Sequence, residues 1–128
     1  MVEPRIKLEE IDRLYERLSK DFELDFPDYV VFKRVLKPVG SIKVWLPERI
    51  GGNLDERHNK RLWLTAKADG EYLGSEDVIE LIADPQKQVS VLTAIHEFLH
   101  YRNKHQGITR SEDEVEREAQ DLRKKLGY

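Results

Sequence analysis

The sequence predicts an α+β fold, with an N-terminal helix on a small, mostly antiparallel sheet of three to four strands, followed by two further helices. Apolar residues recur at helical spacing near the N-terminus and again in the last third of the chain. Between these regions, short runs of β-branched and aromatic residues are bounded by proline and glycine, which is typical of strands. The 128 residues fall within the size of one domain with one core, so we expect a single domain over 1–128, with the first helix and the sheet in 1–83.

The first helix is expected from Pro4 to about Asp21. Its apolar positions are mostly three or four residues apart and would form one stripe that covers a sheet. These positions are Ile6, Leu8, Ile11, Leu14, Leu18 and Phe22. A proline in the first turn is typical of a helix start.

Four segments are candidates for strands. "FPDYVVFKRVLKPVG" and "SIKVWLPE" would form a hairpin with its turn at Pro38 to Gly40. A polar segment, "RIGGNLDERHNK", is expected to be a loop, and "RLWLTAKA" after it alternates as a half-buried strand does. Asp69-Gly70 is a turn signal, and the short apolar run "DVIELIAD" favours a strand because it is mostly β-branched.

The second and third helices have clear boundary signals. Asp84-Pro85 is a helix-start signal and Gly107 a stop, which predicts a helix over 84–106. This helix is apolar almost all round, so it should be buried between two layers. Ser111 followed three residues later by Glu114 forms a capping box that predicts a last helix over 111–126. Its apolar stripe consists of Val115, Ala119, Leu122 and Leu126.

The segment "TAIHEFLHYRN" interrupts the apolar helix with two histidines and a glutamate. His96 and His100 are four residues apart, so their rings stand on one face and can reach a common zinc ion. Glu97 is about 100° further round, where it can act as a general base beside the ion. The alternative is that all three are ordinary surface residues. That pattern arises by chance on the order of once in a few hundred sequences of this length, and buried histidines without partners are costly, so we favour the zinc site.

A catalytic zinc usually takes three protein ligands. The extended motif that would supply a third histidine is excluded, because positions 103 and 106 hold Asn103 and Gln106. His105 points away from His96 on the same helix and His58 lies in the polar loop, so both are expected to be exposed. The last helix offers four glutamates, and periodicity alone does not choose between two of them, Glu116 and Glu118. All four are Glu112, Glu114, Glu116 and Glu118.

These motifs resemble those of the gluzincin metallopeptidases, in which a "glutamate helix" follows the helix that carries H-E-x-x-H. Membrane-embedded members related to CaaX proteases have E-x-x-A-D on that second helix. Glu116 to Ala119 matches E-x-x-A, so the resemblance implies Glu116 as the third ligand, while Gln120 departs from the aspartate that supports a ligand histidine. The chain looks most like the small, soluble archaeal minigluzincins over about 45 residues. This resemblance implies a zincin-like fold with a small twisted sheet.

The function implied is that of a zinc metalloendopeptidase with one Zn²⁺ per chain and a peptide or protein as substrate. Glu97 would take a proton from the zinc-activated water and pass it to the leaving amine. Tyr101, His58 and Arg110 are chemically able to stabilise the oxyanion, and the sequence does not choose among them. The tail "RKKLGY", which ends at Tyr128, is a candidate plug that would keep the enzyme latent as a zymogen, and the alternative is that it is an ordinary helix end. The alternative function is a zinc-stabilised regulatory or binding domain without peptidase activity.

The composition excludes several other classes of function. The chain has no cysteine, so neither disulfides nor thiolate metal sites are possible. Its net charge is −3 with both signs interspersed, which argues against nucleic acid or a membrane surface as a partner. The absence of a long apolar run or a signal peptide predicts a soluble, cytoplasmic protein.

Overall fold

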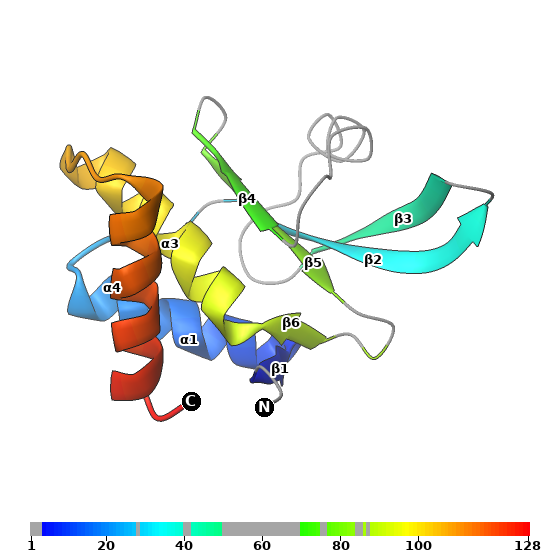
Figure 1. The fold of residues 1–128 in the computed structure, drawn as a ribbon, viewed down its shortest axis with the longest axis horizontal. Helices are drawn as coiled ribbons and strands as arrows, with labels where there is room; N and C mark the ends of the chain where they lie inside the picture. Colours follow the sequence, from blue (N-terminus) through cyan, green and yellow to red (C-terminus); the bar gives the residue numbers. More distant parts are fainter. Residues whose placement is uncertain are drawn as a thin grey trace.

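The computed structural model describes residues 4–27, 29–39, 42–49, 70–74, 77–83, 86 and 88–128. In these ranges the chain has an α+β architecture of strands and helices (Figure 1). No helix among them is long and apolar enough to cross a membrane. In chain order the elements are β1 (Arg5–Lys7), α1 (Leu8–Asp21), β2 (Tyr29–Val39), β3 (Ile42–Arg49), β4 (Gly70–Leu73), β5 (Val78–Ala83), β6 (Gln88–Ser90), α3 (Val91–Gln106) and α4 (Glu112–Lys125).

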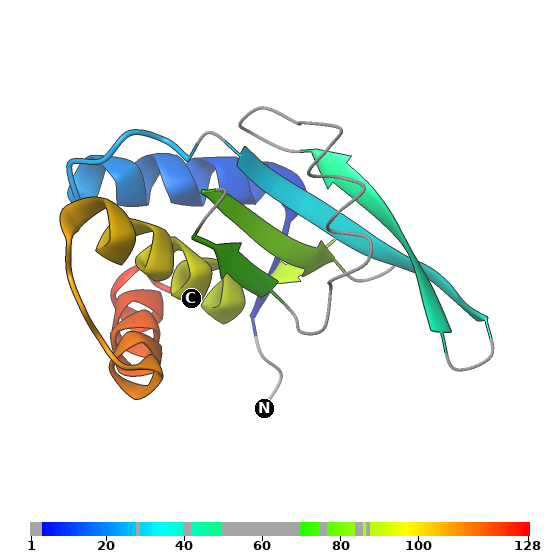
Figure 2. The ribbon, with the colours of Figure 1, turned by 90° about the horizontal axis from the view of Figure 1, so that it is seen from above.

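Four strands form the main sheet in the order β3-β2-β5-β4. The β2–β3 and β4–β5 pairs are antiparallel and the β2–β5 pair is parallel, so the expectation of a mostly antiparallel sheet is confirmed. The β2–β3 hairpin extends away from the helices (Figure 2). β2 continues through Val39, past the expected start of the turn at Pro38. Gly70, expected in a turn, opens the short edge strand β4.

Two further expectations concern the segment between β3 and β4. The loop expected over 49–60 starts one residue too early, because Arg49 is the last residue of β3. The rest of that loop and the strand expected over 61–68 lie outside the described residues.

One hydrophobic core joins the sheet to α1 and α3, and α4 packs on α3. The Tyr15 hydroxyl of α1 donates a hydrogen bond to the Ala94 carbonyl of α3 at 2.8 Å, and the Tyr15 ring lies 5.0 Å from that of Phe98. α3 is therefore enclosed by α1, the sheet and α4, as its nearly all-round apolar surface predicts. The buried core residues are Ile6, Ile11, Leu14, Tyr15, Leu18, Val30, Ile79, Leu81, Val89, Val91, Ala94, Ile95, Phe98, Leu99, Tyr101, Val115 and Ala119.

The expected starts of α1 and α3 were wrong, and a second small sheet explains both errors. β1 and β6 pair antiparallel, with Ile6 opposite Val89 and both side chains buried. The extended backbone that this pairing requires delays α1 until Leu8 and α3 until Val91, instead of Pro4 and position 84. Ser90 is the actual N-cap of α3, since its side chain accepts a hydrogen bond from the Thr93 amide at 3.2 Å.

The other helix boundaries agree with their sequence signals. Gly107 ends α3 in the left-handed conformation with φ of 66°. Ser111 caps α4 through the predicted capping box, in which its hydroxyl accepts from the Glu114 amide and the Glu114 carboxylate accepts from the Ser111 amide, each at 3.2 Å. These hydrogen bonds from Ser111 lower the pKa of the Glu114 carboxyl. Ser111 is therefore the N-cap of α4, and the helix begins at Glu112.

Replacing Ser111 by alanine is expected to lower the free energy of unfolding by about 1 kcal/mol, because α4 loses its N-cap acceptor. Chemical denaturation followed by circular dichroism measures the change. Ser19→Ala is the matched control, because Ser19 lies in α1 and its buried hydroxyl has no hydrogen-bond partner in the described part of the chain. The control should be neutral or slightly stabilising. Equal losses in both variants would contradict the capping role.

Candidate metal centre

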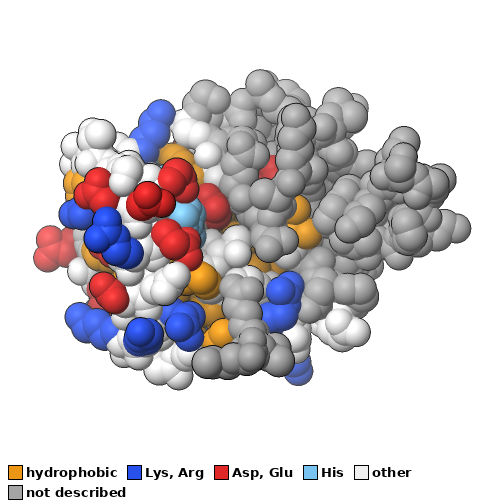
Figure 3. Space-filling view, viewed as in Figure 1, with side chains coloured by type: hydrophobic (Ala, Val, Ile, Leu, Met, Phe, Trp, Pro, Cys, Tyr) orange, Lys and Arg blue, Asp and Glu red, His pale blue; other side chains and the backbone are white. Residues whose placement is uncertain are grey.

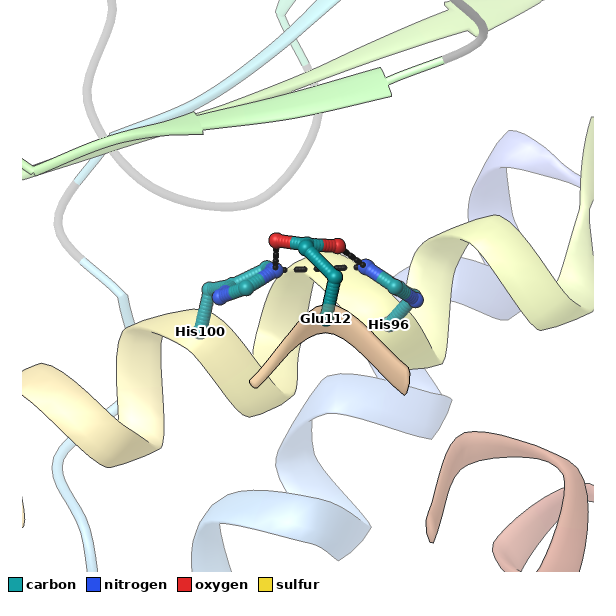
Figure 4. A group of neighbouring side chains, drawn as sticks. All are labelled: His96, His100 and Glu112. Atoms are coloured by element: carbon teal, nitrogen blue, oxygen red, sulfur yellow. Dashed lines mark hydrogen bonds and ion pairs between the residues drawn. The ribbon is translucent and has the colours of Figure 1, made fainter. Parts of the chain in front are cut away.

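Three side chains converge where α3 meets the first turn of α4. His96 and His100 stand one turn apart on α3, and their Nε2 atoms are 3.2 Å apart. Glu112, the first residue of α4, lies over both rings (Figure 4). One of its carboxylate oxygens is 3.0 Å from His96 Nε2 and the other is 2.8 Å from His100 Nε2. Gly107 ends α3 and Ser111 caps α4, so only a short loop separates the two helices. Glu112, the residue after the cap, therefore lies close to His96 and His100.

The geometry of this group fits a metal ion. Two nitrogens bound at ~2.1 Å to a tetrahedral ion lie roughly 3.4 Å apart, close to the separation of the two Nε2 atoms. The three potential ligand atoms of His96, His100 and Glu112 all lie within 4.8 Å of one another, and the group could hold a metal ion. Two imidazoles and one carboxylate are ligands that zinc accepts in catalytic sites, where a fourth position stays open.

Glu116, which the resemblance favours as third ligand, lies at the other nitrogen of the His96 ring. Its Oε2 is 2.8 Å from His96 Nδ1, whereas the cluster forms around Nε2. A proton on Nδ1 donated to this carboxylate leaves Nε2 with a free lone pair, which is the tautomer that a metal ligand needs. Gln120 donates a long hydrogen bond of 3.4 Å to Glu116 Oε1, so its amide is directed at that carboxylate and not at a histidine. The structure therefore places Glu112 at the cluster and Glu116 on the other side of the His96 ring, one turn earlier on α4 than the arrangement that the resemblance implies.

Sequence reasoning passed over Glu112, although a signal for it was present. In the E-x-x-A-D pattern the two acidic residues are four positions apart. Glu112 and Glu116 keep carboxylates at both of those positions, whereas Glu116 and Gln120 do not. This signal is weak by itself, because acidic residues at a helix start are usually solvated and stabilise the helix dipole.

Glu118, the other candidate for third ligand, is directed away from the histidines. It accepts two hydrogen bonds from the Arg102 guanidinium of α3, one of them at 2.8 Å. Arg102 is buried, so this glutamate neutralises a charge inside the α3–α4 interface. A role for Glu118 as a ligand has no support in this geometry.

Glu97, the expected general base, lies inside α3 beside His96 and is 8% exposed. Its negative charge acts on two neighbours, raising the pKa of His96 and contributing to the raised pKa of Tyr15, which burial raises most. Burial lowers the pKa of the His96 ring, but the hydrogen bond to Glu116, the charge of Glu97 and the contact with Glu112 prevail and raise it. The pKa of His100 is lowered, chiefly by burial, so its ring favours the neutral form that a ligand requires.

The centre is open to solvent on one side. The His96 side chain is 14% exposed and that of Glu112 is 72% exposed. Figure 3 shows a pale-blue histidine surface among red acidic side chains over α3 and α4. Among the described residues, the cluster is therefore most accessible to solvent at Glu112.

The structure also places the other residues considered from sequence. His105 Nε2 lies 2.8 Å from Asp77 Oδ1, and His105 is not a member of the cluster. The Tyr101 hydroxyl donates a hydrogen bond to the Asp25 carbonyl at 2.7 Å. It is therefore already engaged and does not support a role in stabilising an oxyanion. Arg110 precedes the α4 cap, and His58 lies outside the described residues.

The tail expected as a plug lies at the end of α4 opposite Glu112 (Figure 1). The Tyr128 carbonyl accepts a hydrogen bond from Arg123 at 2.9 Å, and the Tyr128 amide donates to the Arg123 carbonyl at 3.0 Å. A 14-residue helix is roughly 21 Å long, so the tail does not cover the histidines in this arrangement.

Comparisons with known protein families, curated proteins and solved structures found no match to this chain.

Proposed function

We propose that the protein is a zinc-dependent metallopeptidase whose metal is held by His96, His100 and Glu112. The observation that supports this most directly is the convergence of the two Nε2 atoms and the Glu112 carboxylate within 3.2 Å of one another. Three protein ligands with an open fourth side are typical of hydrolytic zinc sites and not of closed structural ones. The proposal replaces Glu116 with Glu112 as the third ligand and leaves out latency through the tail.

Each residue of the centre has a distinct role in the proposed reaction. Zinc bound there would polarise the scissile carbonyl and lower the pKa of the attacking water. Glu97 would accept the proton of that water and deliver it to the leaving amine. Its low exposure supports this role, because a carboxylate shielded from bulk water is a stronger base toward a nearby proton. The Glu116 carboxylate accepts a hydrogen bond from the Nδ1–H of His96 and so keeps that ring in its metal-binding tautomer.

Zinc titration and a cleavage assay on the same preparation test the proposal. The protein should bind one zinc per chain and should cleave an unfolded protein substrate such as reduced casein. A chelator should abolish cleavage and added zinc should restore it. Absence of stoichiometric zinc binding would rule out the proposal. Stable binding of one zinc without any cleavage would instead support the alternative of a zinc-stabilised regulatory or binding domain.

A further inference from the structure

The α3–α4 interface has polar side-chain contacts along both of its edges. Along one edge, the glutamates of the metal centre contact the histidines of α3. Along the other, Glu118 contacts Arg102. Glu118 is two residues beyond Glu116, which places it about 200° further round the helix. The buried stripe of α4 lies between these edges and consists of Val115 and Ala119.

Arg102 is held from several sides within this interface. The residue is 4% exposed, and its guanidinium forms a two-pronged contact with the Glu118 carboxylate. Its Nε and Nη2 atoms also donate to Asn103 Oδ1 at 3.0 and 2.6 Å. The Phe22 ring lies 4.8 Å from the guanidinium carbon. Two parallel hydrogen bonds between planar groups fix both distance and orientation, so the pair constrains how α4 lies on α3.

This constraint acts on the metal centre through the rigid body of α4. Removing the carboxylate partner from a buried arginine is strongly unfavourable, so α4 is expected to keep the register in which Glu118 reaches Arg102. Sliding α4 by one turn would displace its side chains by about 5.4 Å. Glu112 and Glu116 could then no longer both keep their present contacts with the histidines. Val115 and Ala119 alone are small and would tolerate other registers.

We infer that Arg102 and Glu118 are positioning residues of the metal centre, which hold the Glu112 and Glu116 carboxylates at the histidines before a metal binds. The inference extends the metal site proposed above and depends on it only for the identity of the ligands. It assigns a role to Glu118 that requires no contact with the ion. The pair preorganises the site, which removes the cost of ordering α4 at the moment of metal binding.

Zinc affinity in a set of paired variants tests this role. Glu118→Gln should weaken zinc binding about tenfold, as loss of a supporting contact does. Asp121→Asn, an equal charge change on the exposed side of α4, should leave the affinity unchanged. In a Glu112→Gln background, Glu118→Gln should cause a smaller further loss, because the ligand carboxylate is already gone and only Glu116 remains to be positioned. Equal losses in both backgrounds would show a general effect on stability and would overturn the inference.

A second readout does not require the metal. In metal-free protein labelled with ¹⁵N-histidine, the Nδ1 proton of His96 should be visible by NMR in the wild type and in Asp121→Asn, since Glu116 accepts it. Glu118→Gln should lose this signal, and its persistence would overturn the inference even if the wild type bound no zinc. Should Glu118→Gln fail to fold, Glu118→Asp keeps the charge and shortens the side chain, with the same expected direction in both measurements.

Discussion

Replacing Glu112 by glutamine is expected to weaken zinc binding by about a hundredfold. A four-ligand zinc site contributes roughly 10 to 16 kcal/mol, so one ligand accounts for about 3 kcal/mol. Glutamine keeps the size of the side chain but removes the negative charge that faces both Nε2 atoms at 2.8 and 3.0 Å. Competition with a chromophoric zinc chelator measures the affinity.

Glu116→Gln is the informative comparison, because the same exchange is made one turn further along α4. Its amide oxygen can still accept the Nδ1 proton of His96, so the loss should be about tenfold or less. A larger loss for Glu116→Gln than for Glu112→Gln would restore Glu116 as the third ligand and reject the assignment made from the geometry. Both variants should keep the far-ultraviolet circular dichroism of the wild type.

Glu97→Gln is expected to lower the rate of peptide hydrolysis by about 10² to 10⁴-fold, the contribution typical of a general base. Zinc affinity should change much less, because Glu97 is absent from the group of candidate ligands. Rates on a protein substrate with zinc added in excess separate the loss of the base from the loss of the metal.

Glu16→Gln serves as the control for this exchange, since Glu16 is an exposed residue of α1. Its activity should equal that of the wild type. If Glu97→Gln cleaved substrate at the wild-type rate, Glu97 would have no part in the reaction. If the wild type hydrolysed no peptide, Glu97 would have no catalytic role and would be only a buried carboxylate beside His96.

Local signals in the sequence were sufficient for the features that depend on neighbours along the chain. The i, i+4 spacing puts His96 and His100 on one face of α3, and the capping box starts α4 after Ser111. Gly107 ends α3 because its φ of 66° suits glycine. Each of these depends on residues within about one helical turn, where periodicity and capping rules apply.

The features that the sequence did not reveal all depend on contacts between distant segments. β1 forms because Arg5–Lys7 pairs with Gln88–Ser90, and this pairing overrides the helical spacing that begins at Ile6. The choice between Glu112 and Glu116 depends on how α4 crosses α3, and periodicity along one helix contains no information about the other. The Arg102–Glu118 pair was missed for the same reason.

The small β1–β6 sheet has a consequence for the order of folding. It joins residues more than eighty positions apart, and the Val91 amide at the start of α3 donates to the Pro4 carbonyl at 3.1 Å. Closing so long a loop is slow and entropically costly, whereas α3 and α4 adjoin each other in the chain. We therefore expect the helical pair to form early and the closure of β1 on β6 to limit the folding rate. During synthesis, the first strand therefore has no partner until Gln88–Ser90 has been made.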